Sequence, residues 1–235
     1  MPFESENRMD RLPNVTKNLL AINILMFLAT IVMERQGTDL TAIFGLHFFE
    51  ASDFAPYQFV TYMFMHGGFP HLFFNMFALY MFGGLLERVW GSKRFLIYYL
   101  VCGVGAGLLQ EVTQYVTYLQ EGLDKVQYIK TGLGLLPVNE FLNLVFTTVG
   151  ASGAIYAILL GFAMSFPNER MFVFPLPFPI KAKYFVIGYA LIELSLGVAN
   201  SNDGIAHYAH LGGMLFGLVL ILYWRKKHKI GGPYV

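Results

Sequence analysis

Charged residues are scarce in this chain, and their scarcity excludes two broad classes of protein. Only 13% of the 235 residues are charged, whereas 56% are hydrophobic and 17% are aromatic. The mean hydropathy of +0.53 is too high for an ordinary soluble domain of this length. A net charge of +1 offers no basic face for the phosphates of a nucleic acid. We therefore predict a multi-pass integral membrane protein with no nucleic acid partner.

Cysteine is nearly absent, and the N-terminus lacks the pattern of a removed signal peptide. Cys102 is the single cysteine, so the chain forms no internal disulfide. The first residues are polar, unlike the short basic lead and small-residue cleavage site of a secretory signal. We expect residues 1–17 to be a cytoplasmic leader, followed by a retained first membrane span.

Long hydrophobic runs are plentiful, and they set the expected fold. A membrane helix needs about twenty mostly apolar residues, or somewhat fewer where flanking side chains snorkel. The qualifying segments are Leu19 to Met33, Pro70 to Trp90, Phe95 to Gln110, Ser152 to Phe166 with a lead-in from Phe141, Tyr184 to Ala199, and Ile205 to Trp224. The sequence thus predicts an all-α, six-transmembrane-helix bundle over residues 18–225, with a cytoplasmic tail at 226–235.

Lysine and arginine indicate how the bundle is oriented. With the N-terminus inside, 13 of these residues fall in inner segments and 3 in outer segments. Positive charge accumulates on the cytoplasmic side of membrane proteins, so both termini are expected to be cytoplasmic. Of the two long outer connections, residues 34–66 suit a segment lying at the membrane interface. Residues 111–140 suit a polar excursion, in which Glu111 is expected to be hydrated.

Polar residues within the predicted spans are few, and each is a candidate for function because burying it in lipid is costly. They are His71, Asn75, Ser152, Tyr156, Glu193, His207 and His210. At about 1.5 Å per helical residue, Asn75, Ser152 and His210 all lie roughly 21 to 22 Å above the inner ends of their spans. Three polar groups on different helices therefore share one level.

Two rows of small residues suggest that the fourth and sixth spans approach closely. Gly153, Ala157 and Gly161 follow one another at fourfold spacing, as do Ala209, Gly213 and Gly217. Such rows allow membrane helices to pack with little separation. Because Ser152 precedes the first row and His210 lies beside the start of the second, we expect the serine and the histidine to meet.

This pair suits nucleophilic catalysis. A serine hydroxyl attacks well only when a base takes its proton, and a neutral imidazole is the usual base. Attack on an amide creates an oxyanion that needs fixed donors. His71, Asn75 and the backbone N–H of Ser152 are the candidates for that task.

Three stretches together resemble the rhomboid intramembrane serine proteases in their compact six-span form. They are "HGGFPHLFFNMFALYMFGGLLERVWG" (66–91), "GASGAIY" (150–156) and "AHLGGMLFG" (209–217). The resemblance implies that Ser152 is the nucleophile and His210 the base, without a third acidic member. It also implies that His71 and Asn75 stabilise the oxyanion and that Tyr156 stacks on His210, while Gly150 and Gly153 allow a tight turn around the serine.

The resemblance further implies an activity, a location and partners. Its members cleave other membrane proteins in or near transmembrane segments, so the expected partners are transmembrane substrates and membrane lipid, and the expected location is the bacterial inner membrane. The fifth span is the expected gate for substrates. One departure is that Tyr57 and Gln58 replace a Trp-Arg pair that is common in the family. The oligomeric state is left open.

Other functions remain possible at this point. A non-catalytic relative would bind transmembrane helices without cutting them, and a transporter would use Glu193 near mid-membrane for protons or ions. Glu193 would otherwise be protonated or hydrogen-bonded to a neighbouring helix. Four histidines, His66, His71, His207 and His210, could gather a metal ion. No carboxylate is expected at their level and no His-Glu-x-x-His helix is present, so we predict no metal and no cofactor.

Overall fold

The computed structural model describes residues 12–132, 134–173, 177–199 and 206–227. Residues 1–11 of the predicted leader and 228–235 of the predicted tail lie outside the described residues. The described residues form the α-helices α1 (Asn14–Arg35), α2 (Leu40–Phe44), α3 (Gln58–Thr61), α4 (Phe69–Ala78), α5 (Gly84–Trp90), α6 (Ser92–Gln120), α7 (Val138–Val145), α8 (Ser152–Ser165), α9 (Ala182–Val198) and α10 (His207–Lys226).

Short helical turns and strands join these helices. The turns are η1 (Tyr62–Phe64), η2 (Leu79–Gly83), which links α4 to α5 by a π-helical turn, and η3 (Leu123–Lys125). The strands are β1 (Leu46–His47), β2 (Tyr128–Thr131), β3 (Gly134–Pro137), β4 (Thr147–Thr148), β5 (Arg170–Met171) and β6 (Ile180–Lys181). They form the antiparallel pairs β1 with β4, β2 with β3, and β5 with β6.

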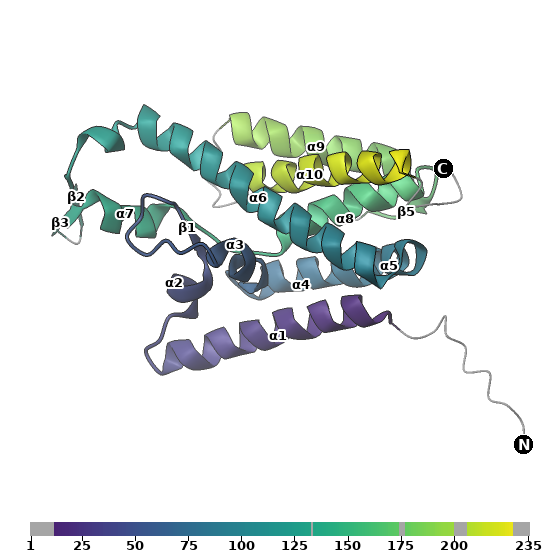
Figure 1. Ribbon diagram of the computed structural model, residues 1–235, viewed down its shortest axis with the longest axis horizontal. Helices are drawn as coiled ribbons and strands as arrows, with labels where there is room; N and C mark the ends of the chain where they lie inside the picture. The colour runs from purple at the N-terminus through teal and green to yellow at the C-terminus, as the bar shows by residue number, and fades with distance from the viewer. Residues whose placement is uncertain (1–11, 133, 174–176, 200–205, 228–235) are drawn as a thin grey trace, which may run out of the picture.

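The prediction of a helical membrane bundle is confirmed. Within the described residues, four stretches are long and apolar enough to cross a membrane, namely Asn14–Arg35, Phe69–Trp90, Ser92–Gln120 and His207–Lys226. Helix α8 is apolar but has only 14 residues, and α9 has 17. The count of six spans and the cytoplasmic location of the termini stay predictions. Helix α1 begins and α10 ends at the same end of the bundle (Figure 1).

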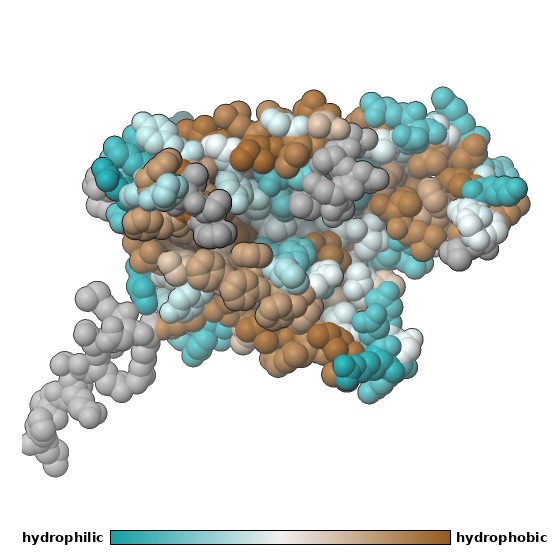
Figure 2. Space-filling view, turned by 180° about the vertical axis from the view of Figure 1, so that it is seen from behind, coloured by the Kyte–Doolittle hydropathy of each residue, from teal (hydrophilic) through white to brown (hydrophobic). Residues whose placement is uncertain are grey.

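The outer surface of the bundle is apolar, as a surface in contact with lipid should be. Leu25 on α1 and Phe74 on α4 are 63% and 68% exposed, respectively. Figure 2 shows hydrophobic bands along one face, with a hollow between them that contains more hydrophilic residues. Hydrophilic side chains are therefore exposed on this lateral face between the apolar bands.

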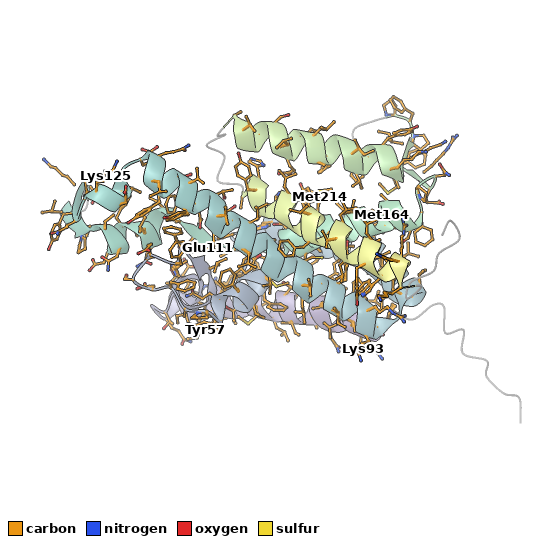
Figure 3. The ribbon with its side chains drawn as sticks, turned by 45° about the horizontal axis from the view of Figure 1, so that its top comes forward. Tyr57, Lys93, Glu111, Lys125, Met164 and Met214 are labelled. Atoms are coloured by element: carbon orange, nitrogen blue, oxygen red, sulfur yellow. The ribbon has the colours of Figure 1, made fainter. Side chains whose placement is uncertain are left out.

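Two predicted boundaries were wrong. The lead-in from Phe141 to the fourth span does not continue α8, because α7 ends at Val145 and β4 separates it from α8. The third span was expected to end at Gln110, but α6 runs on to Gln120. Figure 3 accordingly shows Lys93 near the start of α6 and Lys125, in the turn η3 that follows the helix, near its far end. The polar side chains after Gln110 disguised the continuing helix, which projects beyond the apolar run.

The helix α6 runs through the centre of the bundle and packs against α8 and α10. At the end of the bundle where α1 begins and α10 ends, the rings of Trp90, Tyr98 and Trp224 form a cluster whose centroids are 5.0 to 6.2 Å apart. A Cβ atom on Gly161 would lie 2.7 Å from the Trp90 ring, and one on Gly217 would lie 2.4 Å from the Tyr98 hydroxyl. These two glycines therefore make room for aromatic rings rather than for each other.

A buried carboxylate joins three helices near the start of α1. Glu87 on α5 accepts hydrogen bonds from the backbone N–H groups of Val15 (3.0 Å) and Thr16 (2.7 Å) at the start of α1. It also accepts from the hydroxyls of Thr16 (2.8 Å) and Ser92 (2.6 Å), the latter on α6. Because the first N–H groups of a helix lack partners within the helix, Glu87 acts as a remote cap for α1.

Candidate active site

Ser152 is the first residue of α8, and the segment before it is held in place by backbone pairing. Thr147 and Thr148 in β4 pair with His47 and Leu46 in β1. The backbone N–H of Gly150 donates to the carbonyl of Tyr62 at 2.9 Å. Gly150 has a φ of +131°, which side chains of L-residues rarely allow. The glycine thus permits the sharp turn that presents Ser152 at the start of the helix.

The structure brings Ser152 and His210 together. Nε2 of His210 lies 2.8 Å from Oγ of Ser152, a normal hydrogen-bond distance. The approach depends on small residues, since a Cβ atom on Gly213 would lie 1.9 Å from the carbonyl oxygen of Gly153. The two small-residue rows therefore pack against each other as predicted at Gly153 and Gly213, and again at Ala157 and Gly217, where an added Cβ on Gly217 would lie 3.2 Å from the Cβ of Ala157. Gly161, at the end of its row, instead faces the ring of Trp90.

Tyr156 supports the histidine ring from α8. Its ring stacks on that of His210 with the centroids 4.2 Å apart and the planes 7° apart. Since Tyr156 lies four residues after Ser152, it is one helical turn below the serine on the same face. The stack restricts rotation of the imidazole and keeps Nε2 directed toward the hydroxyl.

His71 and Asn75 lie on one face of α4, and the structure places His71 against the serine segment. A Cβ atom on Gly150 would lie 2.8 Å from Nε2 of His71, so the ring packs directly on this backbone. Asn75 is 6% exposed, and its amide donates to the carbonyl of His71 at 2.9 Å. This hydrogen bond uses one of the two N–H groups of the Asn75 amide.

His66 was expected to be an outer-loop residue; it lies in the connection between η1 and α4, and its side chain is buried beside His71. The centroids of the two rings are 5.1 Å apart, and His66 is 4% exposed. Burial, together with the neighbouring His71, lowers the pKa of His66 from 6.5 to about 4. The ring is therefore neutral at physiological pH and contributes packing rather than charge.

The expectation that no carboxylate shares the level of the histidines is wrong, because Glu193 on α9 reaches both histidines of α10. Its Oε2 atom lies 2.6 Å from Nδ1 of His207 and 3.0 Å from Nδ1 of His210. Its Oε1 atom accepts a short hydrogen bond from the hydroxyl of Tyr156. The expectation that Glu193 is hydrogen-bonded to a neighbouring helix is confirmed. The expected pair of Ser152 and His210 thus has a carboxylate beside it.

The position of Glu193 along its span could have been estimated from the sequence. At about 1.5 Å per residue, Glu193 is roughly 17 Å above the start of α9, within about one helical turn of the level of Ser152. A glutamate side chain spans much of that difference. What the sequence did not supply was the direction in which the residue faces.

Glu193, His207 and His210 also form a group whose ligand atoms all lie within 4.8 Å of one another. Two ligands of a tetrahedral zinc ion stand roughly 3.3 Å apart, given bonds of about 2.0 Å. Both histidine Nδ1 atoms instead approach the same carboxylate oxygen, at 2.6 and 3.0 Å. Hydrogen bonding and ion pairing account for this cluster without a metal. The predicted absence of a metal stays a prediction.

Two more buried polar residues, Gln58 and Glu111, make hydrogen bonds to the segment between α1 and η1. Gln58 is 1% exposed, accepts from Ala55 N–H and donates to the carbonyls of Ile43 and Asp53. Glu111 accepts from Phe49 N–H at 2.9 Å and is 6% exposed, so the expectation that it is hydrated is wrong. Figure 3 shows Glu111 on α6 near the part of the molecule that carries Tyr57.

The fold and the site together define a class, an integral membrane protein that holds a serine and histidine pair inside a helical bundle. Within that class the chain belongs to the rhomboid family, because the family model of the Rhomboid domain matches residues 53–227. The resemblance seen in the sequence is thereby confirmed.

Several relatives carry protease descriptions. The chain is 28% identical to Rhomboid protease AarA of Providencia stuartii over 228 residues, which cover 92% of this chain and 74% of the relative. It is 22% identical to Rhomboid protease GlpG of Haemophilus influenzae, covering 87% of this chain and 88% of that protein. A third relative, Rhomboid-like protein 11 of Arabidopsis thaliana, is chloroplastic and 28% identical, with 86% of this chain and 62% of the relative covered. Family membership therefore supports intramembrane proteolysis as the general activity.

Proposed function

We propose that this protein is a serine endopeptidase that hydrolyses peptide bonds in or near the transmembrane segments of other membrane proteins. The observation that carries this proposal is the 2.8 Å contact between Nε2 of His210 and Oγ of Ser152, inside a helical bundle. The protease descriptions of the relatives support the reaction class. Ser152 is the proposed nucleophile and His210 the proposed general base.

The reaction begins with proton transfer from the hydroxyl of Ser152 to Nε2 of His210. As the Oγ–carbon bond forms, the electron pair of the carbonyl π bond moves to its oxygen. The resulting intermediate collapses when the carbon–nitrogen bond breaks and His210 returns the proton to the leaving amine. Water then attacks the acyl-serine by the same route, and the carboxylic acid leaves.

The oxyanion is stabilised by donors around the start of α8. The backbone N–H of Ser152 is among the first N–H groups of the helix, which have no partner within it and lie at the positive end of the helix dipole. The His71 ring packs on Gly150, and Asn75 lies one turn further along α4. Each such donor typically contributes a few kcal/mol to the transition state.

The hydrophilic hollow on the lateral face is a suitable route by which a transmembrane substrate would enter from the bilayer (Figure 2). The other proposed partner is membrane lipid, in contact with the apolar surface of the bundle. We propose that both termini face the cytoplasm of a bacterial cell, with the bundle in its inner membrane. The 13 to 3 division of Lys and Arg supports the orientation, and the bacterial relatives support the compartment. The start of α1 and the end of α10 at one end of the bundle support this placement (Figure 1).

The test is labelling of the purified protein in detergent with a fluorescent fluorophosphonate, which reacts with activated serines and requires no knowledge of the substrate. Wild type should be labelled, and Ser152→Ala and His210→Ala should not be. Ser195→Ala is the matched control, because the Ser195 hydroxyl is exposed and bonds to the carbonyl of Leu191 on its own helix. This variant should be labelled like wild type.

Absence of labelling in folded wild type would contradict the proposal and favour a relative that binds transmembrane helices without cutting them. Labelling that persists in Ser152→Ala would mean that another serine reacts. A positive result is extended by cleavage of a single-span test substrate in liposomes, with Ser152→Ala as the inactive reference.

A further inference from the structure

Glu193 is a buried carboxylate that the proposed serine and histidine pair does not require. It is 5% exposed, and it contacts two different helices of the site. It accepts a hydrogen bond from the hydroxyl of Tyr156 on α8, and it lies beside Nδ1 of His207 and Nδ1 of His210 on α10. The contact to His210 is on the nitrogen opposite the one that faces Ser152.

We propose that Glu193 is a positioning residue that holds the His210 imidazole in its reactive orientation, so that the site is a serine, histidine and glutamate arrangement whose acid comes from α9. This inference rests on the proposed function and extends it. It departs from the expectation, drawn from the family resemblance, that the pair acts without a third acidic member.

The chemical argument concerns which ring nitrogen carries the proton. An ionised carboxylate only accepts hydrogen bonds, so a carboxylate beside Nδ1 favours the tautomer with hydrogen on Nδ1. Nε2 then presents its lone pair to the Ser152 hydroxyl, as a general base must. When Nε2 takes that proton, the positive charge on the ring is stabilised by the neighbouring carboxylate, which itself stays ionised.

The contact in the resting protein is close but not linear. Nδ1 of His210 lies 3.0 Å from Oε2 of Glu193 but outside hydrogen-bond alignment, so in the resting protein the two groups are in close polar contact, which becomes an ion pair when His210 takes up the proton. Catalytic contacts of this kind are often poorly aligned in free enzymes and tighten as charge develops. The Tyr156 hydroxyl and the His207 ring keep the carboxylate in place for this step.

Because Glu193 belongs to α9, the distance between its carboxylate and His210 depends on how α9 packs against α10. The buried residues of α9 are Ala182, Val186 and Glu193, so Glu193 is the buried residue of the C-terminal half of the helix. Most other side chains there are exposed, including Leu191 at 59% and Ile192 at 54%. A displacement of α9 away from α8 and α10 would therefore withdraw the carboxylate from His210. The imidazole is best oriented when α9 is packed on the bundle.

The test compares Glu193→Gln with wild type on a single-span substrate in liposomes. The amide has the same shape and can still accept from Tyr156, but it carries no charge. We expect kcat to fall at least about 10-fold, as for other carboxylates that orient a catalytic histidine, with KM within about 2-fold of wild type. The matched control Ser195→Ala, two residues along the same helix, should keep both parameters.

A second variant protects the test against loss of folding. Tyr156→Phe keeps the ring that stacks on His210 but removes the hydroxyl that holds Glu193. We expect a smaller fall in kcat, about 3-fold or more, because the carboxylate is then held by fewer donors. The thermal midpoint of each variant is measured alongside, to identify any unfolded protein.

The outcomes separate this inference from the proposed function. If wild type shows no cleavage that depends on Ser152, the proposed function fails. If cleavage depends on Ser152 but both Glu193→Gln and Tyr156→Phe keep the wild-type kcat, the positioning role is overturned. A rise in KM with unchanged kcat would also overturn it, since it would assign Glu193 to the binding of substrates rather than to the orientation of His210.

Discussion

Oγ of Ser152 and Nε2 of His210 lie 2.8 Å apart, although the residues are 58 positions apart in the chain. The distance is set by backbone contact rather than by the two side chains alone. Gly213 on α10 packs directly on the carbonyl oxygen of Gly153 on α8, so the two helices approach to a separation that any side chain would prevent. The chemistry of the site therefore depends on residues that take no part in it.

Gly213→Ala tests this dependence. The added Cβ would lie 1.9 Å from the carbonyl oxygen of Gly153, so α10 must move away from α8. A displacement of about 1 Å commonly costs about a hundredfold in rate, and we expect cleavage and fluorophosphonate labelling to fall by that factor. Gly188→Ala on α9 is the control, because nothing lies within 4 Å of its added Cβ. Equal activity of the two variants would contradict this account of the packing.

Gly150→Ala tests the packing of the His71 ring on the backbone of Gly150. The substitution adds a Cβ at 2.8 Å from the His71 ring, at a φ of +131° that disfavours alanine. We expect kcat to fall at least about 10-fold through displacement of an oxyanion donor. Gly122→Ala carries backbone strain at a φ of +68° without any contact within 4 Å, so it should cost about 1 to 2 kcal/mol of stability at most and leave kcat unchanged. A loss of kcat in both variants would point to strain rather than to His71.

Glu87→Gln tests the remote cap of α1. The glutamine amide can accept through one oxygen only, so some of the four donors around Glu87 lose their partner. We expect a loss of about 2 to 3 kcal/mol in the free energy of unfolding, measured in detergent by denaturant titration. Glu34→Gln, at an exposed position near the other end of α1, is the control and should change stability by less than about 0.5 kcal/mol. A similar effect of both substitutions would rule out the capping role.

The buried His66 should make folding sensitive to acid. Its pKa is about 4 in the folded protein, against the ordinary value of 6.5 that an unfolded chain retains, so the unfolded state binds the proton first as pH falls. The stabilising contribution is complete above about pH 6.5 and is lost progressively toward pH 4. Between pH 7 and pH 5, wild type should lose about 2 kcal/mol more stability than His66→Gln. The measurement is thermal denaturation in detergent at each pH. Equal losses of stability in the two proteins would show that His66 is not the group responsible.

Much of the site was accessible from sequence because membrane burial makes polar residues rare. With few polar side chains in the predicted spans, the common level of Ser152, Asn75 and His210 followed from counting residues at a fixed rise per residue. The rows of small residues predicted close packing, and the packing of Gly213 on Gly153 agrees with that prediction. Helix boundaries were less accessible, because α6 continues for ten residues past its apolar run.

The sequence by itself determined the class of fold, since an apolar chain in a bilayer must satisfy its backbone hydrogen bonds within helices or a closed barrel, and the long apolar runs select helices. It also determined the family, through three short stretches around the site. Only the tertiary structure decided which neighbours meet: Glu193 with the two histidines, and His66 with His71. The rotation of α9 about its own axis and the path of the loops follow from packing against other helices, and that packing leaves no periodic signal in the residues themselves.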